Sequence, residues 1–171
     1  MKQEKTLVFI MGFLFSVFSF ANDQKKGMPK DMPIFRANLE FLEAAEKGHT
    51  ENLKDAFSLG AELNTHNIGS KRTALILSAI NGHESCLNFL LAQKGIDLEA
   101  KDYWGRSALL WACAKGSLSC VVSLLTAGAN FYTKDQDKDD ALTLARKLDT
   151  RDAKNIVEIL KGVMKEDQER E

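Results

Sequence analysis

The sequence has no excess of charge of either sign and none of the common catalytic signatures. Its 171 residues carry 23 Lys and Arg against 24 Asp and Glu, so it lacks the basic stripe typical of nucleic-acid-binding proteins. It also lacks the nucleophile motif Gly-x-Ser-x-Gly, the zinc motif His-Glu-x-x-His and a Gly-rich phosphate-binding loop. We therefore expect no nucleic-acid partner, no enzymatic activity, no catalytic residues and no cofactor.

The chain also lacks an apolar run long enough to span a membrane, which takes about 20 residues. Its longest apolar run covers residues 6–21 and follows a short N-terminal stretch that carries two lysines. At the end of this run, Ser19 and Ala21 are small residues at the −3 and −1 positions of a cleavage site. This pattern is typical of a secretory signal peptide at residues 1–21, with an uncleaved anchor as the alternative. We expect a periplasmic or secreted mature protein without stable membrane association.

Proline occurs only at positions 29 and 33, and this scarcity helps to divide the remaining chain. Both prolines fall in residues 22–37, which we interpret as a linker before the first helix. The charged residues 163–171 are expected to be a solvated tail that frays. Residues 38–162 remain as a single folded domain, since about 100–200 residues is the usual domain size.

What is present is a repeat of about 34 residues. Gly82 and Gly116 are 34 residues apart, Gly48 lies 34 residues earlier, and each is followed by an apolar helical stretch that ends at a second glycine. A period of 33–35 residues with two short helices indicates a solenoid, because one helix pair cannot bury its apolar side alone. The first helices are expected to begin after N-capping side chains, at Asn38, Thr73, Ser107 and Asp140.

The segment GRSALLWACAKGSLSCVVSLLTAGAN resembles the ankyrin-repeat signature, in which Gly-x-Thr-Pro-Leu-His-x-Ala-Ala precedes Gly-His and a Val-Val-x-x-Leu-Leu helix. Ala74 and Ala108 stand where the family has Pro, and Ile76 and Leu110 where it has His. The resemblance implies an all-α ankyrin-repeat solenoid of about four helix-turn-helix units with finger loops. We expect a monomer whose first and last units act as caps.

The few cysteines and histidines have structural explanations in such a repeat. Cys86 and Cys120 occupy equivalent positions of successive units, farther apart than the ~7 Å a disulfide allows, and three cysteines cannot all pair within one chain. We expect Cys86, Cys113 and Cys120 to be buried, reduced and packed as small apolar side chains. His49 and His83 fall in Gly-His turns, where a histidine holds backbone groups, so we expect no metal there.

Asp135, Asp137 and Asp139 have the spacing of a calcium-binding loop. That loop needs Gly at its sixth position and Glu at its twelfth, where this chain has Asp140 and Arg146. The three aspartates fit an exposed finger turn better, and we predict no metal site.

The resemblance implies a protein partner, bound by the finger tips and the inner sides of the first helices. Tyr103 and Trp104 are large aromatic residues at an expected finger tip, and such residues are enriched with Arg at binding hot spots. The alternative for Trp104 is that it folds onto its own repeat; Trp111 is expected in the core. The candidate binding residues are Tyr103, Trp104, Arg106, Ala114, Lys115, His66, Asn67, Ile68, Lys71, Arg72, Ile80, Asn81, Gln136, Asp137 and Asp139.

A rigid binding face without catalytic groups can inhibit an enzyme by covering its active site. We expect an exported binding module that inhibits a periplasmic enzyme, such as a cell-wall (peptidoglycan) hydrolase of the same organism, as self-protection. The alternatives are a scaffold or assembly factor for envelope proteins and a secreted host-directed effector. The fold alone does not choose among them.

Overall fold

The computed structural model describes residues 33–169, and in that range the chain folds into helices joined by turns and loops. An isolated β-bridge between His66 and Thr73 is the one piece of extended pairing among these residues. The expected signal peptide at 1–21 lies outside the described residues. The helices are α2 (Pro33–Lys47), α3 (Thr50–Ser58), α4 (Ala74–Asn81), α5 (Glu84–Leu91), α6 (Ala108–Lys115), α7 (Leu118–Thr126), α8 (Ala141–Arg146) and α9 (Arg151–Gln168).

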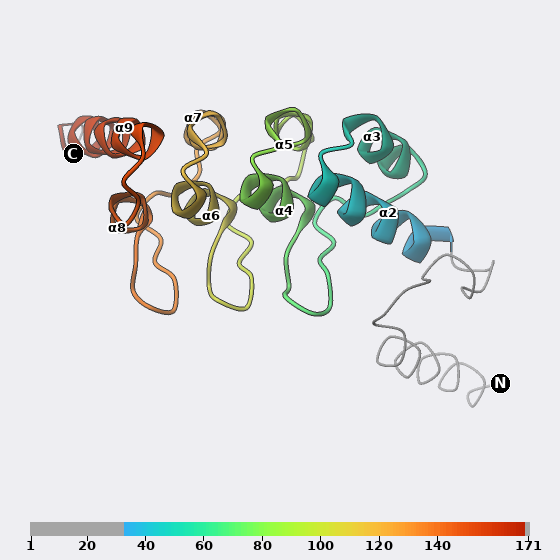
Figure 1. The fold of residues 1–171 in the computed structure, drawn as a ribbon. Coiled ribbons are helices and arrows are strands. Elements are labelled where there is room, and N and C mark those ends of the chain that lie inside the picture. Colours follow the sequence, from blue (N-terminus) through green and yellow to red (C-terminus); the bar gives the residue numbers. More distant parts are fainter. Residues whose placement is uncertain (1–32, 170–171) are drawn as a thin grey trace. The chain divides into compact units, whose positions relative to one another are not determined.

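The helices form four antiparallel pairs that stack on one another, as predicted for a solenoid of four helix-turn-helix units. In Figure 1 the first helices α2, α4, α6 and α8 make one row and the second helices α3, α5, α7 and α9 make another. Three finger loops, residues 61–73, 96–107 and 129–140, extend from the row of first helices on the side away from the second helices (Figure 1). None of the helices in the described range has both the length and the apolar composition needed to cross a bilayer.

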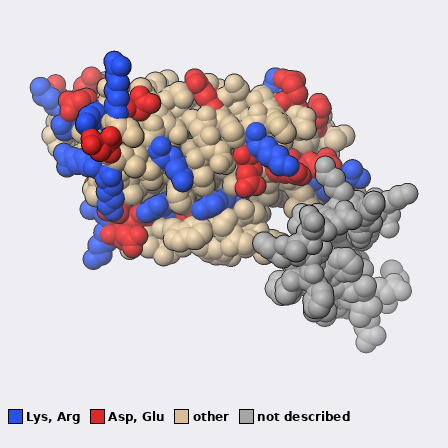
Figure 2. All heavy atoms as spheres, viewed as in Figure 1, with Lys and Arg blue, Asp and Glu red and all other residues tan. Residues whose placement is uncertain are grey.

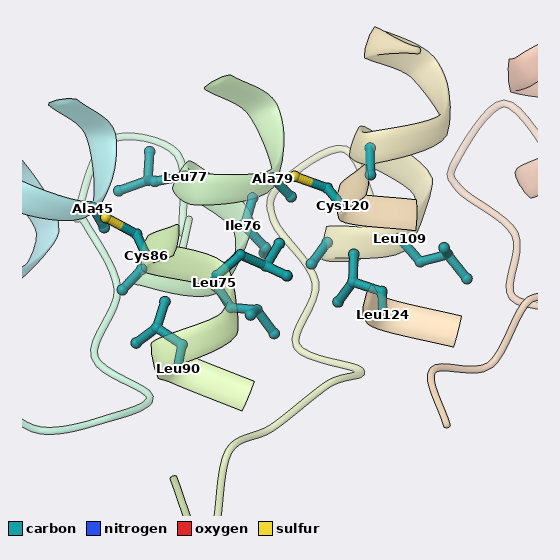
Figure 3. Packing of buried hydrophobic residues seen from close by; sticks show 14 of the residues in the cluster. Ala45, Leu75, Ile76, Leu77, Ala79, Cys86, Leu90, Leu109, Cys120 and Leu124 are labelled. Carbon is teal, nitrogen blue, oxygen red and sulfur yellow. The ribbon is translucent and has the colours of Figure 1, made fainter. Parts of the chain in front are cut away.

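The core is continuous along the stack because equivalent small and apolar residues meet between units. In Figure 3 the sulfur of Cys86 points toward Ala45 of the preceding unit, and that of Cys120 points toward Ala79. All four residues are fully buried. The three cysteines are free and buried, as predicted. The thiols of Cys86 and Cys120 therefore fill small spaces where one unit contacts the next.

The predicted N-caps of the later first helices are confirmed. The side-chain oxygens of Thr73, Ser107 and Asp140 accept hydrogen bonds from the backbone N–H groups of Ile76, Leu110 and Thr143, at 3.3, 3.5 and 2.8 Å. Each bond satisfies one of the donors that a helix start leaves without a partner.

The N-cap prediction for Asn38 is wrong, because Asn38 lies inside α2. Its Oδ1 instead accepts a 2.7 Å hydrogen bond from the backbone N–H of Glu62, which ties the first finger loop to α2. Pro33 suits the first turn of a helix, where its missing N–H costs nothing. Residues 33–37, placed in the linker by composition, are therefore helical.

The C-terminal end also holds more helix than the charge pattern suggests. Helix α9 continues to Gln168, although residues from 163 onward were expected to be a frayed tail. Ile156 and Leu160 are fully buried on one side of α9, which gives the helix an apolar face that covers the end of the core.

The Gly-His turn has the role predicted for His83. Its Nε2 lies 2.9 Å from the carbonyl oxygen of Glu46, in the last turn of α2 in the preceding unit. A Cβ on Gly48, which has a φ of +75°, would lie only 2.6 Å from Nδ1 of His83. Gly48 therefore provides both the left-handed backbone and the space that the His83 ring needs.

Candidate functional site

The aromatic pair at the tip of the second finger loop lies at the surface, as predicted. Tyr103 is 58% exposed and Trp104 is 49% exposed. The Trp104 ring also meets Trp111 of its own unit edge to face, with 6.4 Å between ring centroids and 85° between planes. Trp104 therefore folds partly onto its own repeat while keeping half of its surface in solvent.

Trp111 packs against the core, as predicted, but it is only half-buried. It lies on α6 beneath the second finger loop, between the finger residues and the helix. Its indole Nε1 donates a 2.7 Å hydrogen bond to Asp102 in that loop. The helical pattern places apolar side chains on α6 but does not distinguish the buried side from the side that faces the finger.

Two arginines and a lysine surround this pair of indoles. The Arg72 guanidinium carbon is 5.0 Å from the Trp104 ring centroid and 4.9 Å from that of Trp111. Arg106 approaches Trp111 to 4.9 Å, and Nζ of Lys115 approaches it to 6.0 Å. Because Arg72 comes from the preceding finger, these cation–π contacts join two units through their exposed side.

Asp102 is the buried centre of this arrangement, a role that its sequence context did not predict. Its carboxylate is fully buried, and Oδ1 accepts hydrogen bonds from the backbone N–H groups of Trp104 and Arg106, both at 3.0 Å. Oδ2 accepts the bond from Trp111 and lies 3.5 Å from Nε of Arg72. One carboxylate thus fixes the finger backbone, one indole and one arginine.

The same device recurs in the neighbouring fingers. Asp135 is buried and pairs with Nε of Arg106 at 2.8 Å, while its Oδ1 accepts from the N–H groups of Asp137 and Asp139. Asn67 accepts from the backbone N–H of Arg72. The recurrence of Asn67, Asp102 and Asp135 at 33–35 residue intervals is the sequence signal that could have identified them.

The environment of Asp135 favours its charged form. Burial raises the pKa of Asp135. This effect is outweighed by the hydrogen bond from Arg106, the hydrogen bonds from backbone N–H groups and the positive charge of Arg106, so the pKa lies below its usual value. The carboxylate oxygens of Asp135, Asp137 and Asp139 lie within 4.8 Å of one another. The carboxylate oxygens of Asp135 already accept hydrogen bonds from Arg106 and from the backbone of the turn, and Asp139 pairs with Lys147. The structure of the finger turn therefore explains why the three aspartates lie together.

Backbone hydrogen bonds join the fingers edge to edge. The N–H of Tyr103 donates to the carbonyl of Ser70 in the first finger, at 3.1 Å. The N–H of Gln136 in the third finger donates to the carbonyl of Trp104, also at 3.1 Å, and its side-chain amide donates to the carbonyl of Tyr103 at 2.7 Å. The tips therefore form a connected and rigid surface.

The structure brings part of the candidate set together in what we call the finger surface. It comprises the candidates Lys71, Arg72, Tyr103, Trp104, Arg106 and Lys115, together with Trp111, which was not among the candidates. Among the other candidates, the exposed ones are His66, Ile68, Asn81, Gln136 and Asp137. Asn67, Ile80, Ala114 and Asp139 are half-buried. Asn67 and Arg106 hold finger turns in place, and Asp139 pairs with Lys147 of the last unit.

Comparison with known proteins identifies the repeat. A family model described as "Ankyrin repeats (3 copies)" matches residues 41–135, more than half of the chain. L-asparaginase of Dirofilaria immitis is 39% identical over 74 residues, which are 43% of this chain and 12% of that protein. The Inhibitor of Bruton tyrosine kinase of Xenopus laevis is 36% identical over 77 residues, 44% of this chain and 6% of that protein.

A third relative is also matched over only a part of its length. E3 ubiquitin-protein ligase XBAT32 of Arabidopsis thaliana is 30% identical over 95 residues, 55% of this chain and 18% of that protein. The chain thus spans less than a fifth of the length of each of these relatives. The similarity concerns a short region of each relative.

Proposed function

This chain belongs to the ankyrin-repeat family, whose repeats are protein–protein interaction modules, and we propose that it binds and inhibits a periplasmic enzyme. A cell-wall (peptidoglycan) hydrolase made by the same organism is the enzyme we put forward, with self-protection as the purpose. Proteins built of ankyrin repeats are typically non-enzymatic. Binding is therefore the activity to explain.

The observation that carries this proposal is the exposed aromatic tip on a rigid base. Tyr103 and Trp104 present large apolar areas to solvent, although finger tips usually carry small polar residues. Asp102 and Arg72 hold this tip from below, and the neighbouring fingers hold it from both sides. A partner would meet a surface that is already ordered, so little conformational entropy would be lost on binding.

Inhibition follows from the shape of a projecting tip and from the expected compartment. An aromatic tip that enters an active-site cleft excludes the substrate without any chemistry of its own. The export signal expected at residues 1–21 motivates the periplasm as the site of action. Cells need protection there from their own wall-cutting enzymes, because such enzymes and their substrate share the compartment.

Capture from a periplasmic extract tests the proposal. Immobilised wild-type protein should retain one enzyme, identified by mass spectrometry, and the double variant Tyr103→Ala/Trp104→Ala should retain little of it. Tyr132→Ala is the control, because this aromatic side chain is also 49% exposed but lies beside α9, away from the finger surface. Equal capture by wild type and double variant, or capture of a partner that is no enzyme, would contradict the proposal.

A further inference from the structure

The charges of the two central units are unevenly distributed. Residues 66–81 and 101–116 cover the tips of the first two fingers and the inner helices α4 and α6. They contain five basic residues and one acidic residue: Lys71, Arg72, Lys101, Arg106, Lys115 and Asp102. Since Asp102 is buried, the exposed charge of these segments is entirely positive.

The flanking units have a different balance. Helix α2 carries two basic residues against three acidic ones, and residues 134–149 carry four basic against five acidic. Figure 2 shows a mostly tan surface over the central finger loops with Lys and Arg side chains close to it. An excess of positive charge is therefore a property of these two central segments and not of the whole chain.

The two arginines and the three lysines contribute differently to this charge. Arg72 and Arg106 face the buried carboxylates of Asp102 and Asp135, which offset much of their charge. Lys71, Lys101 and Lys115 are exposed, and within residues 33–169 none of the three forms an ion pair. Lys115 lies beside the aromatic cluster, with Nζ 6.0 Å from the Trp111 ring centroid, and Lys71 follows Ser70, whose carbonyl accepts from the Tyr103 N–H. Nζ of Lys101 donates to the carbonyl of Lys134 in the third finger.

We infer that the partner segment recognised by the finger surface is acidic and carries an apolar side chain that packs on Tyr103 and Trp104. The inference rests on the proposed function and adds the chemistry of its partner. Acidic side chains beside the apolar anchor would meet Lys71 and Lys115 at the rim of the contact. Such rim charges speed association and select the partner by complementarity.

A nucleic acid fits this surface less well than an acidic protein segment. A phosphate backbone needs a positive track along its length. Here the next finger along the row has mixed charge, because the exposed carboxylate of Asp137 lies between the exposed Lys134 and Lys138 in the sequence. The positive region is thus about as wide as two fingers, which suits a short acidic segment.

Defined peptides test the inference directly. Fluorescein-labelled peptides would share the same Leu and Phe residues and differ at the remaining positions, which hold Glu, Ser or Lys. Fluorescence anisotropy with the full chain should show the Glu peptide binding at least about tenfold more tightly than the Ser peptide, and more weakly at high salt. The Lys peptide should show no binding.

Charge reversal supplies the matched comparison. Lys71→Glu/Lys115→Glu should remove the preference for the Glu peptide. Lys94→Glu/Lys161→Glu makes the same change in net charge at two exposed residues outside the finger surface and should retain the preference. Because Lys115 is in the last turn of α6, thermal unfolding must first show that the reversed variant is folded.

The inference is overturned if the Ser or Lys peptide binds as well as the Glu peptide, if none binds, or if charge reversal has no effect. Tighter binding of a duplex DNA oligonucleotide than of the Glu peptide would overturn it as well. These outcomes are separable from failure of the proposed function. Partner capture that is lost in Tyr103→Ala/Trp104→Ala, with no charge preference among the peptides, would remove this inference alone.

Discussion

The indole Nε1 of Trp111 donates a 2.7 Å hydrogen bond to Oδ2 of Asp102 and so links helix α6 to the finger that carries the exposed aromatic tip. The same carboxylate accepts from two backbone N–H groups and faces Arg72. The finger surface therefore depends on a buried charge that makes no contact with solvent.

Removing this carboxylate should destabilise the protein clearly. Asp102→Ala leaves the Trp111 N–H and two backbone N–H groups without their acceptor and Arg72 without its ion-pair partner. We expect a loss of about 2–4 kcal/mol in the free energy of unfolding. Urea unfolding measures this loss. Asp97→Ala is the control, because the Asp97 carboxylate accepts a hydrogen bond from the backbone N–H of Glu99 at an exposed site. This variant should lose no more than about 0.5 kcal/mol in the free energy of unfolding. Equal losses in the two variants would contradict the role given to Asp102.

The lowered pKa of Asp135 gives stability a definite pH dependence. A group whose pKa is lower in the folded state stabilises the fold above its unfolded pKa, and that contribution is lost as the pH falls through the folded pKa. Urea unfolding followed from about pH 6 to about pH 3 should show falling stability, with a shallower fall in Asp135→Asn. The same slope in both proteins would show that Asp135 does not contribute.

The three thiols should be reduced and unreactive in the folded protein. Burial raises the pKa of Cys113 to about 12 and also raises that of Cys120, so little of the reactive thiolate is present at neutral pH. A chromogenic disulfide reagent should react slowly with native protein and quickly in urea. Rapid labelling of the native protein, or an internal disulfide found by mass spectrometry, would be incompatible with this packing.

Two glycine-to-alanine changes should have opposite effects. Gly48→Ala places a Cβ against the His83 ring at a φ of +75° and should cost more than about 1 kcal/mol. Gly162→Ala, in α9 with open space around the new methyl group, should stabilise by about 0.5–1 kcal/mol. Thermal unfolding of both variants compares them directly. Destabilisation by Gly162→Ala would show that α9 is not an ordinary helix at that point.

Local patterns predicted most of the fold. The 34-residue period, the capping residues Thr73, Ser107 and Asp140, and the small positions filled by Cys86 and Cys120 depend on neighbours close in sequence or on exact repetition. These features follow from helix geometry and from the stacking of units, and the same residue pattern for them occurs in each repeat.

The finger surface was only partly predictable. Exposure of Tyr103 and Trp104 followed from their place at a turn. The stacking of Arg72 against two indoles depends on the register between fingers more than 30 residues apart, which no local pattern specifies. The half-exposed side of Trp111 was not predictable for the same reason, because its environment is formed by the preceding finger as well as by its own helix.

The measurement that tests the central claim most directly is the activity of the captured enzyme as increasing amounts of this protein are added. We predict that activity falls to near zero once the protein equals the enzyme in amount. Tyr103→Ala/Trp104→Ala should require roughly 30- to 1000-fold more protein, the loss expected when a ~2–4 kcal/mol anchor is truncated. Full activity of the enzyme while it is bound, or equal inhibition by the double variant, would contradict the account.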